Sequence, residues 1–123
     1  RILLAEDNEI NLEIVTELLS GLGFAVDGAA NGAEAVERFK SSSSGYYSII
    51  LMDIQMPVMN GLEAADAIRR SDHADASSIP IIALSANAFE EDVEKSLAHG
   101  MQAHISKPID MNTLKKLFVK YIR

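Results

Sequence analysis

Three carboxylates stand directly after short apolar runs of the sequence. Glu6 and Asp7 follow the run at residues 2–5, and Asp53 follows the run at 47–52. If these two runs form neighbouring parallel strands, the three carboxylates meet in one small area and repel one another strongly. A divalent cation relieves such repulsion, and a ligand set made only of oxygen atoms favours Mg²⁺, Mn²⁺ or Ca²⁺ over Zn²⁺.

A hydroxyl and an amine follow two further apolar runs. Ser85 comes after residues 79–84, and Lys107 comes after residues 103–106. Protein-bound Mg²⁺ usually has one or two carboxylate ligands together with phosphate oxygens, and a carboxylate can attack phosphorus to form an aspartyl-phosphate. Lysine and serine are suited to hold the phosphoryl oxygens. Asp53 stands alone after a central run, so it is the candidate nucleophile, while the acidic pair is better placed to hold metal.

Each of these residues also has an ordinary structural interpretation. A lone aspartate after a strand is usually a turn former, and an acidic pair is favourable at the start of any helix. Ser85 suits a helix cap and Lys107 suits an exposed surface. Together, however, these residues favour the chemical interpretation. They follow four different apolar runs, and those runs are predicted to be strands from their hydrophobic pattern alone, independently of the polar residues that follow.

Apolar runs alternate with amphipathic segments along the whole chain, which predicts five strands and five helices. The strands are expected at residues 2–5, 24–29, 47–52, 79–84 and 103–106. The helices are expected after residue 8, after residue 31, and over 62–70, 88–98 and 110–121. Apolar strands joined by helices indicate a doubly wound parallel α/β sheet, whose functional site lies beyond the carboxyl ends of the strands.

The first helix has a regular apolar pattern. Ile10, Ile14, Leu18 and Leu22 recur every four residues and are expected to share one helical face, with Val15 and Leu19 beside them. Either Asp7 or Asn8 can cap the start of this helix.

The composition excludes several classes of protein. The chain has 123 residues, 48% of them hydrophobic, which fits a single domain over residues 1–123. The net charge of −7 disfavours direct binding to nucleic acid or to an anionic membrane. The absence of cysteine excludes disulfides, thiolate metal sites and a cysteine nucleophile. No apolar run approaches a membrane span, and the chain opens at Arg1 without Met, so we expect a segment of a longer cytoplasmic protein.

Four motifs, taken together, resemble the receiver domain of two-component response regulators. They are Ala5-Glu6-Asp7-Asn8, Met52 to Gly61, Ala83-Leu84-Ser85-Ala86 and Ser106-Lys107-Pro108, in an order and spacing that fit from residue 2 to about residue 122. More narrowly, residues 7–11, 55–61 and 104–109 are similar to receivers attached to hybrid sensor histidine kinases. The resemblance implies the flavodoxin-like receiver fold, with strand order 2-1-3-4-5.

The resemblance also implies a metal-dependent phosphorylation site. Asp53 would accept a phosphoryl group from a phosphohistidine on a histidine kinase or a histidine phosphotransfer domain. Asp7 and Asp53 would bind Mg²⁺, for which Mn²⁺ can substitute. The backbone carbonyl of Gln55 would be the third protein ligand, and Glu6 would act through a metal-bound water.

Further roles follow from the same resemblance. Ser85 and Lys107 would hold the phosphoryl group, and the Lys107–Pro108 peptide bond would be cis, an isomer that is accessible chiefly before proline. Gln55 and Asn87 would tune the lifetime of the phosphate. Phosphorylation would switch the surface near the fourth and fifth strands.

One position departs from the commonest pattern of the family. The fifth strand carries His104 where the family usually has Tyr or Phe, a ring that swings inward when the hydroxyl after the fourth strand moves toward phosphate. Hybrid-kinase receivers often have histidine here. Both a switching role and an ordinary, partly exposed strand position remain open for His104.

Three other functions fit the residues less well. A hydrolase that uses an aspartyl-phosphate commonly has a second acid two residues after the nucleophile, but Gln55 stands there and cannot exchange a proton. A flavin nucleotide binder needs a Gly/Ser/Thr-rich loop after the first strand, where Glu6 and Asp7 would repel phosphate. An interaction module that is not phosphorylated would be expected to lack site residues. All five candidate site residues are present in this chain: Glu6, Asp7, Asp53, Ser85 and Lys107. We therefore expect a monomeric phosphoacceptor that is not an enzyme by itself.

Overall fold

The computed structural model describes residues 1–123 apart from 55, 57, 86–99, 107–110 and 122–123. Five parallel strands form one sheet in the order β2-β1-β3-β4-β5. The described elements are β1 (Ile2–Ala5), α1 (Glu9–Gly21), β2 (Val26–Ala29), α2 (Gly32–Lys40), β3 (Ile49–Asp53), α3 (Gly61–Arg70), β4 (Ile81–Ser85), β5 (Ala103–Ser106) and α5 (Met111–Tyr121). The predicted fold class and strand order are confirmed, while the helix predicted over 88–98 lies outside the described residues.

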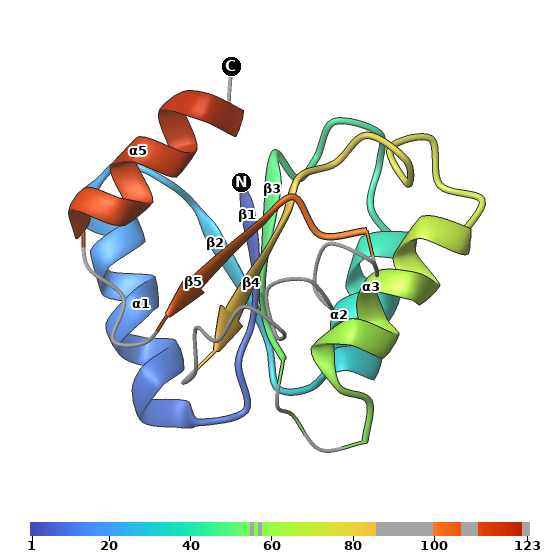
Figure 1. The fold of residues 1–123 in the computed structure, drawn as a ribbon, viewed down its shortest axis with the longest axis horizontal. Helices are drawn as coiled ribbons and strands as arrows, with labels where there is room; N and C mark the ends of the chain where they lie inside the picture. Colours follow the sequence, from blue (N-terminus) through green and yellow to red (C-terminus); the bar gives the residue numbers. More distant parts are fainter. Residues whose placement is uncertain (55, 57, 86–99, 107–110, 122–123) are drawn as a thin grey trace.

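Helices cover both faces of the sheet (Figure 1). The α1 and α5 helices lie on one side, and α2 and α3 lie on the other. Alternate residues of the central strands enter two separate core clusters: Leu3 and Ile50 pack under α2 and α3, while Leu4 and Leu51 pack under α1 and α5. Because these strands are buried on both faces, their sequences are continuous apolar runs without polar alternation. None of the helices in the described part of the chain is long and apolar enough to cross a membrane.

The second strand begins at Val26, two residues after the expected start at Phe24. The chain turns at Gly23, which has a φ of +94°, and the Phe24 N–H donates to the Leu19 carbonyl oxygen at 3.1 Å. The Phe24 ring then packs edge-on against Phe118 of α5, with ring centroids 4.9 Å apart. Phe24 therefore belongs to the core as a loop residue that covers the end of α1.

The third and fourth strands also begin two residues later than predicted, and each extends one residue further. The Tyr47 hydroxyl donates to Asp27 at 2.8 Å, and burial together with this bond raises the pKa of Tyr47 well above its usual range. Pro80 has no N–H to donate, so β4 starts after it, although its carbonyl oxygen still accepts from Ile50 N at 2.9 Å. The extensions bring Asp53 and Ser85 into the strands themselves.

The prediction for the face of α1 was wrong in part. Val15 and Leu19 are the buried residues of this helix, whereas Ile10 and Ile14 are 69% and 51% exposed. Four residues turn an α-helix about 40° beyond a full turn, so a stripe of four-residue spacing drifts around the helix and leaves the core. The α1 helix begins at the carboxyl edge of the sheet (Figure 1), with Ile10 in its first turn and Ile14 in its second.

An asparagine caps each helix that follows one of the first three strands. The side chain of Asn8 accepts from the backbone N–H of Ile10 and Asn11, so Asn8 and not Asp7 is the cap of α1. Asn31 accepts from Glu34 N at 2.8 Å, and Asn60 forms a reciprocal capping box with Glu63. These caps fix where the chain turns from strand to helix, at the sheet edge where the predicted site lies.

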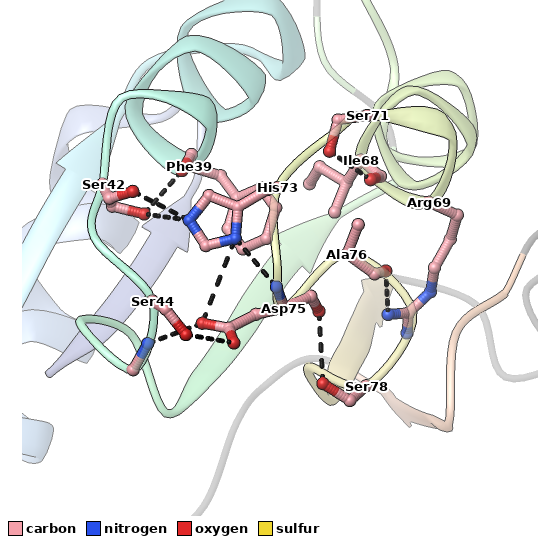
Figure 2. Close-up of polar contacts among 11 residues, drawn as sticks. Phe39, Ser42, Ser44, Ile68, Arg69, Ser71, His73, Asp75, Ala76 and Ser78 are labelled. Carbon is pink, nitrogen blue, oxygen red and sulfur yellow. Dashed lines mark hydrogen bonds and ion pairs between the residues drawn. The ribbon is translucent and has the colours of Figure 1, made fainter.

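Polar side chains join the loops at the opposite, amino edge of the sheet (Figure 2). His73, after α3, donates from Nε2 to the Ser42 carbonyl oxygen at 2.8 Å and accepts at Nδ1 from Asp75 N at 3.0 Å. Its ring packs on Phe39 with centroids 4.3 Å apart. Asp75 accepts from Gly45 N at 2.7 Å, which lowers the pKa of that carboxyl. The loops that follow α2 and α3 are therefore held together far from the carboxyl edge.

Arg69 connects α3 to the segments that precede β4 and β5. Its half-buried guanidinium donates to the carbonyl oxygens of Ala76 and Gly100 and to Oε1 of Gln102, at 2.7 to 3.0 Å. Burial lowers the pKa of Arg69. No carboxylate is among these acceptors, so the interaction is a set of charged hydrogen bonds to neutral oxygens.

We expect Arg69→Ala to lower the free energy of unfolding by about 3 kcal/mol, because buried carbonyl oxygens lose a charged donor. Urea denaturation measures the change. Arg70→Ala is the matched control, since Arg70 is adjacent and exposed, and it is expected to change stability by less than about 0.5 kcal/mol. Equal effects of the two substitutions would contradict the structural role of Arg69.

Candidate phosphoacceptor and metal site

Strand register brings the carboxyl ends of β1 and β3 together. Ala5 pairs with Met52, so the next residues, Glu6 and Asp53, leave the sheet side by side. The Glu6 N–H donates to the Ala29 carbonyl oxygen at 3.0 Å and so prolongs the pairing of β1 with β2. In Figure 1 this edge is the lower one, where the strand arrows point.

The structure gathers the three predicted acids in one cluster. One carboxylate oxygen from each of Glu6, Asp7 and Asp53 lies within 4.8 Å of the other two. Glu6 and Asp53 are 3% and 4% exposed, whereas Asp7 is exposed to solvent. Buried carboxylates at this separation repel one another, and a hard divalent cation offsets the repulsion with oxygen ligands. The donor set therefore fits Mg²⁺, and the exposed Asp7 leaves one side of the cluster at the surface.

Asn11 contacts this cluster from the first turn of α1. Its Nδ2 donates to Oε1 of Glu6 at 3.1 Å, while its backbone N–H donates to the Asn8 side chain at 3.1 Å. No individual role for Asn11 was predicted from the sequence. The sequence offered only a weak indication of such a role, because polar residues are common in the first turn of an amphipathic helix.

Two close backbone approaches, which were not predicted from the sequence, hold Ile54 and Met59 in the segment after Asp53. The Gly61 N–H donates to the Ile54 carbonyl oxygen at 2.8 Å, and the Gly32 N–H donates to the Met59 carbonyl oxygen at 3.0 Å. A methyl group on Gly61 would overlap the carbonyl oxygen of Asp53, and one on Gly32 would overlap that of Met59. Only glycine allows this contact of α2 and α3 with the loop.

Val58 lies in the same loop with a backbone conformation that β-branched residues rarely adopt. Its φ is +67°, and its side chain is 83% exposed. Such a residue is strained and persists only where the surrounding structure fixes it, which the two glycine contacts do here. Local strain beside a functional residue is a common feature of functional sites.

The remaining predicted site residues divide into two groups. Ser85 ends β4 and lies one residue beyond Leu84, the partner of Asp53, and it pairs with Ser106 of β5. His104 pairs with Ala83 and is half-buried. The others lie outside the described residues: Gln55, Asn87, Lys107 and Pro108, including the predicted cis bond between the last two.

The fold and the site together define a class of protein. In a doubly wound sheet of order 2-1-3-4-5, the order in which successive strands join the sheet reverses between β1 and β3, and ligands bind outside the carboxyl ends of the strands at this point. Here that point holds three carboxylates, which suit a cation and not a bare phosphate. The sequence model described as "Response regulator receiver domain" matches residues 2–119. The chain belongs to this family, and it is a phosphoacceptor receiver domain of two-component phosphorelay signalling.

Several relatives are histidine kinases. The chain is 38% identical over 122 residues to hybrid signal transduction histidine kinase L of Dictyostelium discoideum and 39% identical over 114 residues to peroxide stress-activated histidine kinase mak1 of Schizosaccharomyces pombe. These matches cover 98% and 92% of this chain but only 7% of either relative. The chain thus corresponds to a small part of each kinase.

Solved receiver structures share the whole fold. The receiver domain of sensor histidine kinase PA1611 from Pseudomonas aeruginosa, with a magnesium ion in its active-site cleft, superposes with a TM-score of 0.87 at 36% identity, covering 98% of this chain and 95% of that one. The Saccharomyces cerevisiae receiver domain of Ssk1, crystallised with the histidine phosphotransfer protein Ypd1, gives a TM-score of 0.84 at 32% identity, covering 98% and 86%.

Proposed function

We propose that residues 1–123 form a single receiver domain in which Asp53 accepts a phosphoryl group from a phosphohistidine of a partner. The main support is the meeting of Glu6, Asp7 and Asp53 within 4.8 Å at the carboxyl ends of β1 and β3. The magnesium ion in the PA1611 receiver supports a metal in the corresponding place.

In the proposed reaction, a carboxylate oxygen of Asp53 attacks phosphorus. The bond between phosphorus and the histidine nitrogen breaks, its electron pair returns to the imidazole ring, and an acyl phosphate forms. Asp7 and Asp53 would hold Mg²⁺, with Gln55 through its carbonyl oxygen and Glu6 through a water molecule. When bound, the ion neutralises negative charge on the phosphoryl oxygens. Burial of Asp53 restricts the access of bulk water to the reacting carboxylate.

Two further residues would hold the phosphoryl group. We assign Lys107 as the cation that neutralises one phosphoryl oxygen and Ser85 as the hydroxyl that donates to another. The end of β4 next to Asp53 supports the assignment of Ser85. Gln55 and Asn87 would tune the lifetime of the phosphate, and the surface near β4 and β5, with His104, would respond to phosphorylation.

The partner in this proposal is a histidine kinase or a histidine phosphotransfer domain. The Ssk1 receiver complex with Ypd1 is a precedent for the second of these. Exposed apolar side chains support docking at the carboxyl edge of the sheet, with Ile10 in the first turn of α1 and Val58 in the loop after β3. We further propose that the domain does not turn over external substrates, and that its parent is a hybrid histidine kinase with this domain in the cytoplasm.

The proposal is tested by phosphotransfer from a phosphorylated histidine phosphotransfer domain to the chain in the presence of Mg²⁺. A labelled phosphoprotein that loses its label in base and on treatment with hydroxylamine is the expected product, as for an acyl phosphate. Mass spectrometry of the digested product should place the phosphoryl group on the peptide that contains Asp53. Modification of any other residue would contradict the assignment of the nucleophile.

Removal of divalent metal is expected to stop phosphorylation. Charge neutralisation by the ion contributes several kcal/mol to the transition state, so a chelator should slow labelling by at least about 100-fold. The labelling rate with a small phosphodonor measures this, and Mg²⁺ or Mn²⁺ in excess of the chelator should restore it. Circular dichroism is the control for unchanged fold, and an undiminished rate would exclude the metal role.

A further inference from the structure

Asn11 joins the start of α1 to the acidic cluster through a side-chain hydrogen bond. Its Nδ2 donates to Oε1 of Glu6 at 3.1 Å, and Glu6 is 3% exposed. We propose that Asn11 is a positioning residue that orients the Glu6 carboxylate for divalent-metal binding. The inference rests on the proposed function, since it concerns the metal that supports phosphorylation.

The position of Asn11 is itself fixed by the helix cap. Asn8 accepts from the backbone N–H of Asn11 at 3.1 Å and from that of Ile10 at 3.0 Å. The backbone N–H and the side-chain amide of Asn11 thus bond in two directions, one to the cap and one to Glu6. The result is a continuous set of hydrogen bonds from the first turn of α1 to a carboxylate of the cluster.

Glu6 needs such a partner more than the two aspartates do. A glutamate side chain has three rotatable bonds and an aspartate has two, so its carboxylate loses more conformational freedom when it is fixed. A donor to one oxygen sets the plane of the carboxylate, and one of its oxygens then lies within 4.8 Å of carboxylate oxygens of Asp7 and Asp53. Oriented carboxylates bind metal more tightly because less freedom is lost on binding.

The chemical type of residue 11 also matters. An amide donates a hydrogen bond without carrying charge, so it orients Glu6 and leaves the negative charge of the cluster intact. A lysine or arginine at the same place would orient the carboxylate but would compete with the cation. Asn11 is therefore suited to a site that must attract a divalent ion.

The test compares Mn²⁺ affinities of the unphosphorylated chain, measured by the electron paramagnetic resonance signal of free Mn²⁺. We expect Asn11→Ala to raise the dissociation constant about 5-fold, less than the roughly 10-fold or more that loss of a partner of a direct metal ligand causes, because Glu6 would act through a metal-bound water. Asn11→Leu, which keeps the branched shape and the number of side-chain heavy atoms without a donor, should give the same result. Alanine and leucine are good helix formers, so α1 should persist, and urea denaturation checks that it does.

Asn112→Ala is the matched control, because Asn112 is an exposed asparagine in the first turn of α5. Its affinity for Mn²⁺ should change by less than about twofold. In a Glu6→Gln background, Asn11→Ala should also change affinity by less than about threefold, since the carboxylate that it orients is absent.

Wild-type affinity in folded Asn11→Ala and Asn11→Leu would overturn the positioning role while leaving the metal site intact. An undiminished effect of Asn11→Ala in the Glu6→Gln background would overturn it as well, because Asn11 would then act through helix stability. If the wild-type chain itself shows no saturable Mn²⁺ binding, the proposed function and this inference fail together.

Discussion

Asp53→Asn is expected to abolish phosphorylation of the chain. An amide oxygen is a far weaker nucleophile than a carboxylate and carries no charge for a metal ion, so labelling should fall by at least about 1000-fold. Asparagine has nearly the volume of aspartate, and the backbone of this residue is held in β3 by its pairing with Leu84. The fold should therefore remain, and a loss of labelling would reflect the missing carboxylate and not unfolding.

The measurement uses a phosphohistidine donor and a small phosphodonor in parallel, with incorporated phosphate counted per chain. Asp72→Asn is the matched control, because Asp72 is exposed in the loop after α3 and lies at the amino edge of the sheet. It should label at the wild-type rate. Persistent labelling of the Asp53→Asn variant at wild-type stoichiometry would remove Asp53 from the reaction.

Gly61→Ala is expected to disturb the backbone that carries Asp53. The added carbon would overlap the carbonyl oxygen of Asp53 and lie 2.9 Å from its carbonyl carbon and from Cα of Ile54. These are backbone atoms of the strand end and its loop, so no side-chain rotation relieves the overlap. We expect the free energy of unfolding to fall by at least about 2 kcal/mol.

The same substitution should impair phosphorylation, since the strand end that moves carries Asp53. Urea denaturation and the labelling rate of the remaining folded protein measure the two effects separately. Gly21→Ala is the control: Gly21 ends α1 and an added methyl meets no atom within 4 Å, so stability should be unchanged or rise by up to about 1 kcal/mol. Equal stability of the two variants would show that the chain relaxes around residue 61.

Local pattern in the sequence was enough to predict the fold class. The β1, β3 and β4 strands are buried on both faces, so their residues form continuous apolar runs that a linear inspection detects. The helices between them begin at asparagine caps, which are likewise local signals. The strand order required more than local pattern and came from the resemblance to receivers, which the pairing of β1 with both β2 and β3 bears out.

Strand boundaries and helix faces were less predictable, because long-range contacts decide them. Phe24 has the residue type of a strand but leaves β2 to pack on Phe118 of α5. Ile10 and Ile14 are apolar, yet they face solvent because α1 presents Val15 and Leu19 to the sheet. Neither outcome follows from the segment in which the residue stands.

Local sequence pattern was enough to predict which residues form the acidic cluster, because Glu6, Asp7 and Asp53 stand where apolar runs end. Tertiary structure decided how closely they meet, through the register that pairs Ala5 with Met52. Tertiary structure also decided which residues contact the cluster. The Asn11 side chain donates to Glu6, and Gly61 packs against the backbone of Asp53. Strand ends are encoded by local hydrophobicity, whereas distances across a sheet depend on pairing between segments some fifty residues apart.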